Sequence, residues 1–149
     1  MKNVKYIVVH CTETPPSATI EELKRLPETE TWSLRNTNHF VVARNGESKW
    51  LFKYRKYSDC MLNKDCIHIA YIGGIDKDGK PVDNRTQRQE DALFDKLVEL
   101  SNRYPQAEIV GYKDLPGIQS ASPCFDVKKW LANYEPDFLE LEYETELAA

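Results

Sequence analysis

The sequence predicts an α/β protein with a central mixed β-sheet flanked by helices. Short apolar runs rich in β-branched residues alternate along the chain with amphipathic segments at helical spacing. The 149 residues are 41% hydrophobic and 30% charged, which is typical of a single globular domain with one core. We expect this domain to span residues 1–134. An acidic tail, residues 135–149, follows it and carries no basic residue.

The chain begins with a predicted strand and a short helix. Residues 5–12 (KYIVVHCT) form a continuous apolar run of the kind found in buried strands. Residues 14–26 turn at two prolines and then show helical spacing. Either Ser17 or Thr19 can cap this helix, and acidic residues favour its first turn.

The middle of the chain predicts a hairpin, a buried strand and a long helix. Residues 37–55 contain two strand-like runs joined by a turn at Asn45–Gly46. Residues 66–74 (CIHIAYIGG) form another buried strand that ends at two glycines. Residues 86–105 show the clearest helical periodicity, with Thr86 as the expected cap.

The C-terminal part predicts a last core strand and a short helix. Residues 107–112 are strand-like, and residues 126–134 are amphipathic with Asp126 as the expected cap. A long loop joins them, and long loops inside compact domains are usually functional.

Charge and composition exclude several classes of partner. The net charge of −4 gives no reason to expect nucleic acid, and no apolar run approaches the length of a membrane span. The apolar run near the N-terminus is too short for a signal peptide, so we expect a cytoplasmic protein unless a leader was removed. Residues 50–57 interleave aromatic and basic side chains and could bind an anionic partner, although a solvated strand is the favoured interpretation. The acidic tail could likewise bind a partner or cover the groove of the domain, although a solvated terminus is the favoured interpretation.

The four cysteines leave two interpretations open. They could form two disulfides, but the absence of a CxxC pair favours free thiols in a reducing compartment. The cysteines are Cys11, Cys60, Cys66 and Cys124.

His10 is the first candidate functional residue, because functional groups of α/β proteins gather where strands end. A histidine in this place could be a metal ligand, a general base or a structural histidine, and the pattern alone does not choose among them.

Four motifs together resemble the type 2 N-acetylmuramoyl-L-alanine amidases, the superfamily of the bacteriophage lysozyme-type amidases and the peptidoglycan-recognition proteins. The resemblance covers about residues 4–134. The motifs are IVVHCTET, NHFVVARNG, the segment from IHIAYIGG to the helix at TQRQEDAL, and GYKDLPGIQSASPCFDVKKWL. The resemblance implies the amidase fold and a bacteriophage or bacterial setting. It also implies a zinc ion held by two histidines and a cysteine, with a tyrosine and a lysine assisting cleavage of the bond between N-acetylmuramate and L-alanine.

The positions of that family site are largely substituted here. His10 matches the first zinc ligand, whereas Tyr112 and Ser122 stand at the other two ligand positions. Asn38 and Ser120 stand where the resemblance places the catalytic tyrosine and lysine. A phenol and a hydroxyl are poor zinc ligands at neutral pH compared with imidazole and thiolate.

We predict a vestigial groove formed by residues of the first strand, the hairpin and the last loop: His10, Asn38, His39, Tyr112, Ser120, Ser122 and Cys124. His39 matches a histidine of structural role in the family, and His68, in place of a usual glycine, is interpreted as a buried structural histidine. Cys124 could join His10 and Cys11 in a displaced metal site, although Cys11 should point away from His10 across the strand.

We therefore expect a catalytically inactive amidase-like protein that binds a peptidoglycan fragment or a protein partner as a recognition or regulatory scaffold. No confident catalytic residue and no cofactor are expected. The alternative is an active N-acetylmuramoyl-L-alanine amidase with a rebuilt zinc site.

Overall fold

The computed structural model describes residues 4–25, 40–50 and 65–134. Asn38, His39, Cys60, most of the basic-aromatic segment and the acidic tail lie outside these ranges, so the predictions about them stay predictions. The described elements are β1 (Tyr6–Cys11), α1 (Ile20–Lys24), β2 (Phe40–Val42), β3 (Ser48–Trp50), β4 (Cys66–Tyr71), α3 (Gln87–Arg103), β5 (Glu108–Gly111), the 3-10 helix η2 (Tyr112–Asp114) and α4 (Val127–Asn133).

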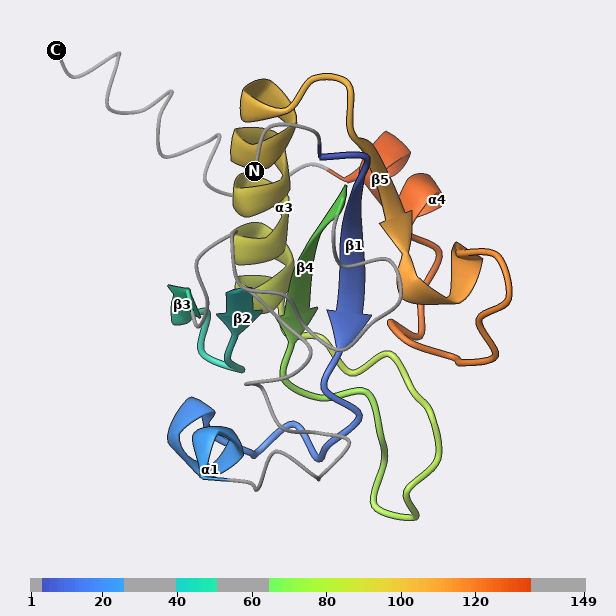
Figure 1. Cartoon of the computed structure of the whole chain (residues 1–149). Coiled ribbons are helices and arrows are strands. Elements are labelled where there is room, and N and C mark those ends of the chain that lie inside the picture. The colour runs from blue at the N-terminus through green and yellow to red at the C-terminus, as the bar shows by residue number, and fades with distance from the viewer. Residues whose placement is uncertain (1–3, 26–39, 51–64, 135–149) are drawn as a thin grey trace, which may run out of the picture.

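The strands form one mixed sheet, as the sequence predicts. Their order is β3-β2-β4-β1-β5, and β1 lies at the centre of the parallel part, between β4 and β5. Strand β2 runs parallel to β4, whereas β3 pairs antiparallel with β2 in the predicted hairpin. Strands β1, β4 and β5 run toward the same edge of the sheet, beyond which α1 lies (Figure 1).

Local capping interactions begin the helices at the predicted residues. The Thr86 hydroxyl accepts the Gln89 backbone N–H at 3.2 Å, and the Gln89 side chain accepts the Thr86 N–H at 3.0 Å, which completes a capping box on α3. Asp126 caps α4, and Thr19 caps α1. Hydrogen bonds within a few residues of sequence therefore account for where these helices start.

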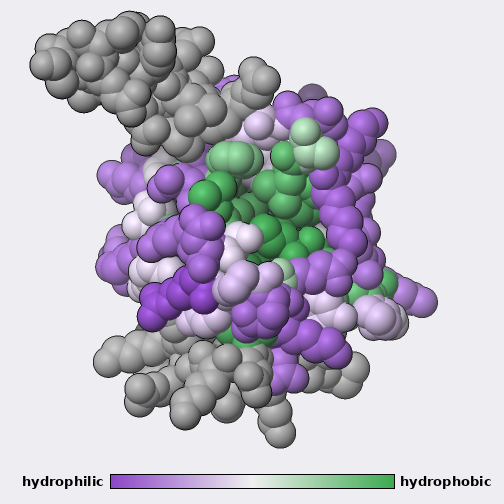
Figure 2. Space-filling model, turned by 90° about the horizontal axis from the view of Figure 1, so that it is seen from above, coloured by the Kyte–Doolittle hydropathy of each residue, from purple (hydrophilic) through white to green (hydrophobic). Residues whose placement is uncertain are grey.

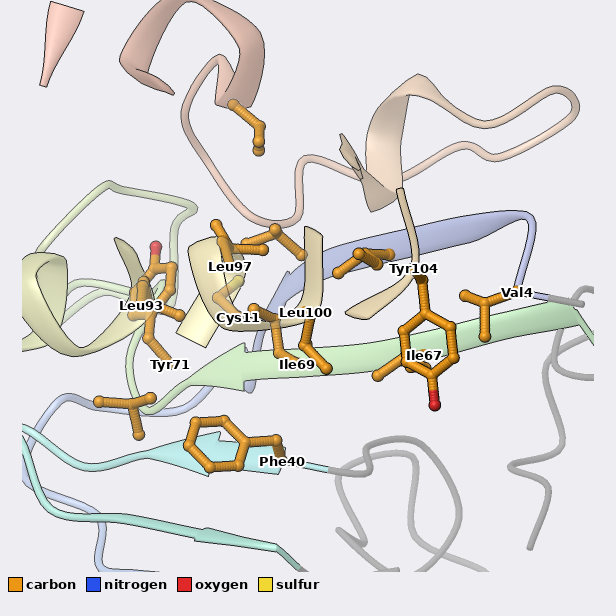
Figure 3. Close-up of a cluster of buried hydrophobic side chains, with 14 of the residues drawn as sticks. Val4, Cys11, Phe40, Ile67, Ile69, Tyr71, Leu93, Leu97, Leu100 and Tyr104 are labelled. Carbon is orange, nitrogen blue, oxygen red and sulfur yellow. The ribbon is translucent and has the colours of Figure 1, made fainter. Parts of the chain in front are cut away.

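The main core lies between the sheet and α3. Alternate residues of the central strands point to this face, where they meet Leu93, Leu97 and Leu100 of α3 (Figure 3). On the face seen from above, hydrophobic residues gather in the middle with hydrophilic residues around them (Figure 2). The same alternation places Cys11 in this core and leaves the preceding residue, His10, on the opposite face.

The loop after β5 contains a feature that the sequence pattern did not predict. Residues Tyr112–Asp114 form η2 directly after the strand. The Lys113 backbone N–H donates to the Ser122 carbonyl at 2.8 Å, which ties the start of the loop to its end. No helix in the described ranges is long and apolar enough to cross a membrane.

Candidate functional site

His10 lies near the end of β1 on the face of the sheet opposite α3. Its side chain is largely buried, with 8% of the residue exposed. Its Nε2 atom lies 2.9 Å from Nδ1 of His68, within hydrogen-bonding distance. Because one ring nitrogen must donate and the other accept, this hydrogen bond requires at least one of the two imidazoles to be neutral.

His68 reaches His10 through the register of two parallel strands. His10 is paired with Ala70 of β4, and His68 precedes that partner by two residues. Side chains two residues apart on a strand share a face, so the two imidazoles become diagonal neighbours. The prediction that His68 is buried holds, since it is fully inaccessible. Its place beside His10 was missed, because it depends on a register that the sequence pattern does not specify.

Tyr112 stacks on one face of the His10 ring. The centroids of the two rings lie 4.5 Å apart with an interplanar angle of 30°, so the phenol stacks on the imidazole. Tyr112 is the first residue of η2 and is half-buried. The predicted groove residues His10 and Tyr112 are therefore brought together, and His68 joins them.

The two serines of the loop form a second group of contacts at the end of β1. The Ser122 hydroxyl accepts the backbone N–H of Cys11 at 2.9 Å, and the Ser120 hydroxyl accepts the backbone N–H of Ser122 at 3.1 Å. The Ser120 hydroxyl in turn donates to Glu13 Oε1 at 3.3 Å. Partial burial raises the pKa of the Glu13 carboxyl, while the hydrogen bond from Ser120 opposes that shift. Glu13 was not singled out from the sequence.

Cys124 lies beside Cys11, and not beside His10. The two sulfur atoms are 4.0 Å apart, on the α3 side of β1. Burial raises the pKa of the Cys11 thiol to about 12, and burial likewise raises the pKa of Cys124. Within the described residues, neither Cys11 nor Cys124 is in a disulfide.

The donor set at the three family ligand positions does not fit a catalytic zinc ion. Catalytic zinc sites use imidazole, thiolate or carboxylate ligands, whereas these positions present one imidazole, one phenol and one hydroxyl. The Nε2 atom of His10 faces His68, and the Ser122 hydroxyl is bonded to the backbone of Cys11. Within the described ranges no three His, Cys, Asp or Glu residues are grouped as a metal site would require. The displaced trio of His10, Cys11 and Cys124 does not converge, because β1 separates His10 from both thiols.

A groove of about 1060 Å³ lies elsewhere, between α1, the β2–β3 hairpin and the start of α3. Its lining includes three basic residues and two acidic ones: Arg44, Lys49, Arg88, Glu21 and Glu47. Neither His10 nor Tyr112 lines it, so this groove is separate from the histidine face.

Comparison with known proteins supports the class that the fold and the histidine position indicate. Residues 1–124 match the N-acetylmuramoyl-L-alanine amidase family. The chain is 28% identical to the endolysin of Enterobacteria phage K11 over 135 residues, covering 85% of each chain. It is 29% identical to the endolysin of Escherichia phage T7 over 132 residues, covering 83% of each chain.

Solved structures agree on the fold. The Ph2119 endolysin from a Thermus scotoductus bacteriophage superposes with a TM-score of 0.69 at 20% identity, covering 89% of this chain and 84% of that one. Peptidoglycan Recognition Protein-1 of Manduca sexta gives a TM-score of 0.59 at 16% identity, covering 91% and 81%. The fold is thus that of the type 2 amidases and peptidoglycan-recognition proteins. This chain belongs to the N-acetylmuramoyl-L-alanine amidase family.

Proposed function

We propose that this chain is a catalytically inactive member of the amidase family that binds a peptidoglycan fragment as a recognition or regulatory scaffold. The observation that carries the proposal is the state of His10. Its Nε2 atom faces His68 at 2.9 Å and its ring stacks on Tyr112, so the imidazole belongs to a packed cluster of protein side chains.

The chemistry of amide hydrolysis supports this interpretation. The family reaction, as the resemblance implies it, needs a polarising metal and an activated water. A phenol at position 112 and hydroxyls at positions 120 and 122 supply neither strong zinc ligands nor a cationic group for a developing oxyanion. Tyr112 and Ser120 are partly exposed, so their phenol and hydroxyl groups suit contact with the sugar and amide groups of a muropeptide.

The names of similar proteins support the ligand class. The matched phage proteins are endolysins, and one structural neighbour is a peptidoglycan recognition protein. Recognition of a ligand by this fold needs only a surface of suitable shape with hydrogen-bonding groups, and it needs no bound metal.

The proposal is tested by three measurements on the full chain with a muramyl dipeptide as the probe. After dialysis against zinc and removal of excess metal, elemental analysis is expected to find much less than one zinc per chain. Chromatography is expected to find the amide bond of the probe intact. Calorimetry is expected to detect binding, weakened about tenfold by Tyr112→Ala, the equivalent of about 1.4 kcal/mol.

The matched control is Lys128→Ala. This residue is exposed on α4 at the far side of the sheet, where its ammonium pairs with Glu108 at 2.6 Å, and its removal should leave binding unchanged. Stoichiometric zinc together with cleavage of the probe would establish the alternative, an active amidase with a rebuilt metal site. Absence of binding by the wild-type chain would refute recognition of the fragment.

A further inference from the structure

Cys11 and Cys124 form a close pair of thiols that the proposed function does not use. Their sulfur atoms are 4.0 Å apart although the residues are 113 positions apart in the sequence. Cys11 is buried at the end of β1, whereas Cys124 is partly exposed in the loop before α4. Cys124 is therefore the more accessible residue of the pair, and the Cys11 sulfur lies in contact with the Cys124 sulfur.

Gly74 lies beside both thiols. Gly74 has a φ of +101°, and a Cβ at this residue would lie 2.8 Å from the Cβ of Cys11. The Cys11 side chain thus occupies the place that a side chain at Gly74 would need, and it packs directly against this glycine. The Cys124 thiol points to the same place, since it donates to the Gly74 carbonyl at 3.5 Å.

The backbone of Cys124 is also unusual. Its φ is +72°, a left-handed conformation that is unfavourable for a residue with a side chain. This conformation follows a backbone hydrogen bond of 2.7 Å from the Cys124 N–H to the Ala121 carbonyl. The loop therefore holds Cys124 against β1 in spite of an unfavourable backbone angle.

We propose that Cys11 and Cys124 are a reversible oxidation site that forms an intramolecular disulfide with a low-molecular-weight disulfide such as oxidised glutathione. The thiolate of Cys124, a minor species at neutral pH because burial raises the pKa of this thiol, attacks the reagent, forms a mixed disulfide and releases one reduced glutathione. The Cys11 sulfur then attacks the Cys124 sulfur and displaces the second glutathione. In total two protein thiols lose two electrons and two protons, and one oxidised glutathione becomes two reduced molecules.

The disulfide would fix the loop that carries the candidate site. Residues 112–124 include Tyr112, Ser120 and Ser122, and at their end they meet β1 through the Cys11 N–H to Ser122 hydroxyl contact. A covalent bond one residue beyond His10 would hold this loop at the end of β1. The disulfide would also close a covalent loop that spans the 113 positions between Cys11 and Cys124, and so restrict the unfolded chain. We expect this restriction to raise the midpoint of thermal unfolding by about 10 °C.

The experiment uses the reduced full chain incubated in glutathione buffers of increasing oxidised fraction. Free thiols are blocked with N-ethylmaleimide, the chain is digested, and linked peptides are identified by mass spectrometry. The expected product is a peptide pair joined through Cys11 and Cys124, which dithiothreitol converts back to two free thiols. The unfolding midpoint should rise with the same dependence on buffer potential.

Two variants serve as controls. Cys124→Ser should abolish both the linked peptide and the rise in midpoint. Cys66→Ser removes a fully buried thiol of β4 and should change neither.

The proposal is overturned if Cys11 and Cys124 both remain alkylated at the most oxidising buffer. It is also overturned if Cys124 stops at the glutathione adduct, or if either thiol pairs instead with Cys60 or Cys66. These readouts do not depend on whether the chain binds a muropeptide or zinc.

Discussion

Replacing Tyr71 by phenylalanine removes a single hydroxyl from the core and tests how the site loop is held. Tyr71 ends β4 and is fully buried, and its hydroxyl donates to the Pro123 carbonyl at 2.6 Å. Phenylalanine keeps the ring and leaves almost no cavity, so the substitution isolates the hydrogen bond. Leaving a buried carbonyl without this donor costs about 1–3 kcal/mol, so Tyr71→Phe should lower the free energy of unfolding by that amount at pH 7.

The cost should depend on pH in a direction set by the tyrosine. Burial raises the pKa of Tyr71 far above the value of about 10 that it has when unfolded. The native chain therefore keeps a proton that the unfolded chain loses. The stabilisation by Tyr71 is complete below pH 10 and falls as the pH rises above 10, by about 1.4 kcal/mol per pH unit. The difference between wild type and Tyr71→Phe should consequently shrink between pH 10 and pH 11.

Urea unfolding followed by tryptophan fluorescence at pH 7 and at pH 10.5–11 measures both effects. The control is Tyr6→Phe, the same chemical change at a half-buried residue of β1, for which we expect a change within about 0.5 kcal/mol. A loss below about 0.5 kcal/mol at pH 7 would refute the role of the Tyr71–Pro123 hydrogen bond. A difference that stays constant through pH 11 would refute the assignment of a raised pKa.

Three further substitutions probe the site and the frame around it, each by urea unfolding. His68→Ala should cost about 3–5 kcal/mol, because it leaves a cavity and removes the hydrogen-bond partner of His10; a loss below 1 kcal/mol would contradict the packed histidine pair. Gly74→Ala should cost at least about 2 kcal/mol, because a Cβ there is strained and collides with a buried cysteine. Its control is Gly79→Ala, where φ is +77° but the space is open, and an equal cost at both glycines would argue against the collision. Thr86→Ala should cost about 1–2 kcal/mol through loss of the α3 capping box, and an unchanged stability would show that the cap is dispensable.

The sequence alone determined the elements, because their signals are local. Helix α3 begins where Thr86 and Gln89, three residues apart, form the hydrogen bonds of a capping box. The hairpin turns at Asn45–Gly46, where Gly46 has a φ of +90°. The continuous apolar runs of β1 and β4 predicted buried central strands, and both strands are buried along nearly their whole length. The motifs also identified the family and predicted that two of its three ligand positions, 112 and 122, are substituted.

Only the tertiary structure determined which side chains lie in contact around the site. The contact between His10 and His68 joins residues 58 positions apart, and that between Cys11 and Cys124 joins residues 113 positions apart. Both depend on the parallel register of β1 with β4 and on the return of the loop to the end of β1. Periodicity shows which face of a strand a residue occupies, but it does not show which residue of another strand lies beside it. For this reason the sequence placed His10 and Cys11 on opposite faces of β1, and the fold alone supplied the partner of each.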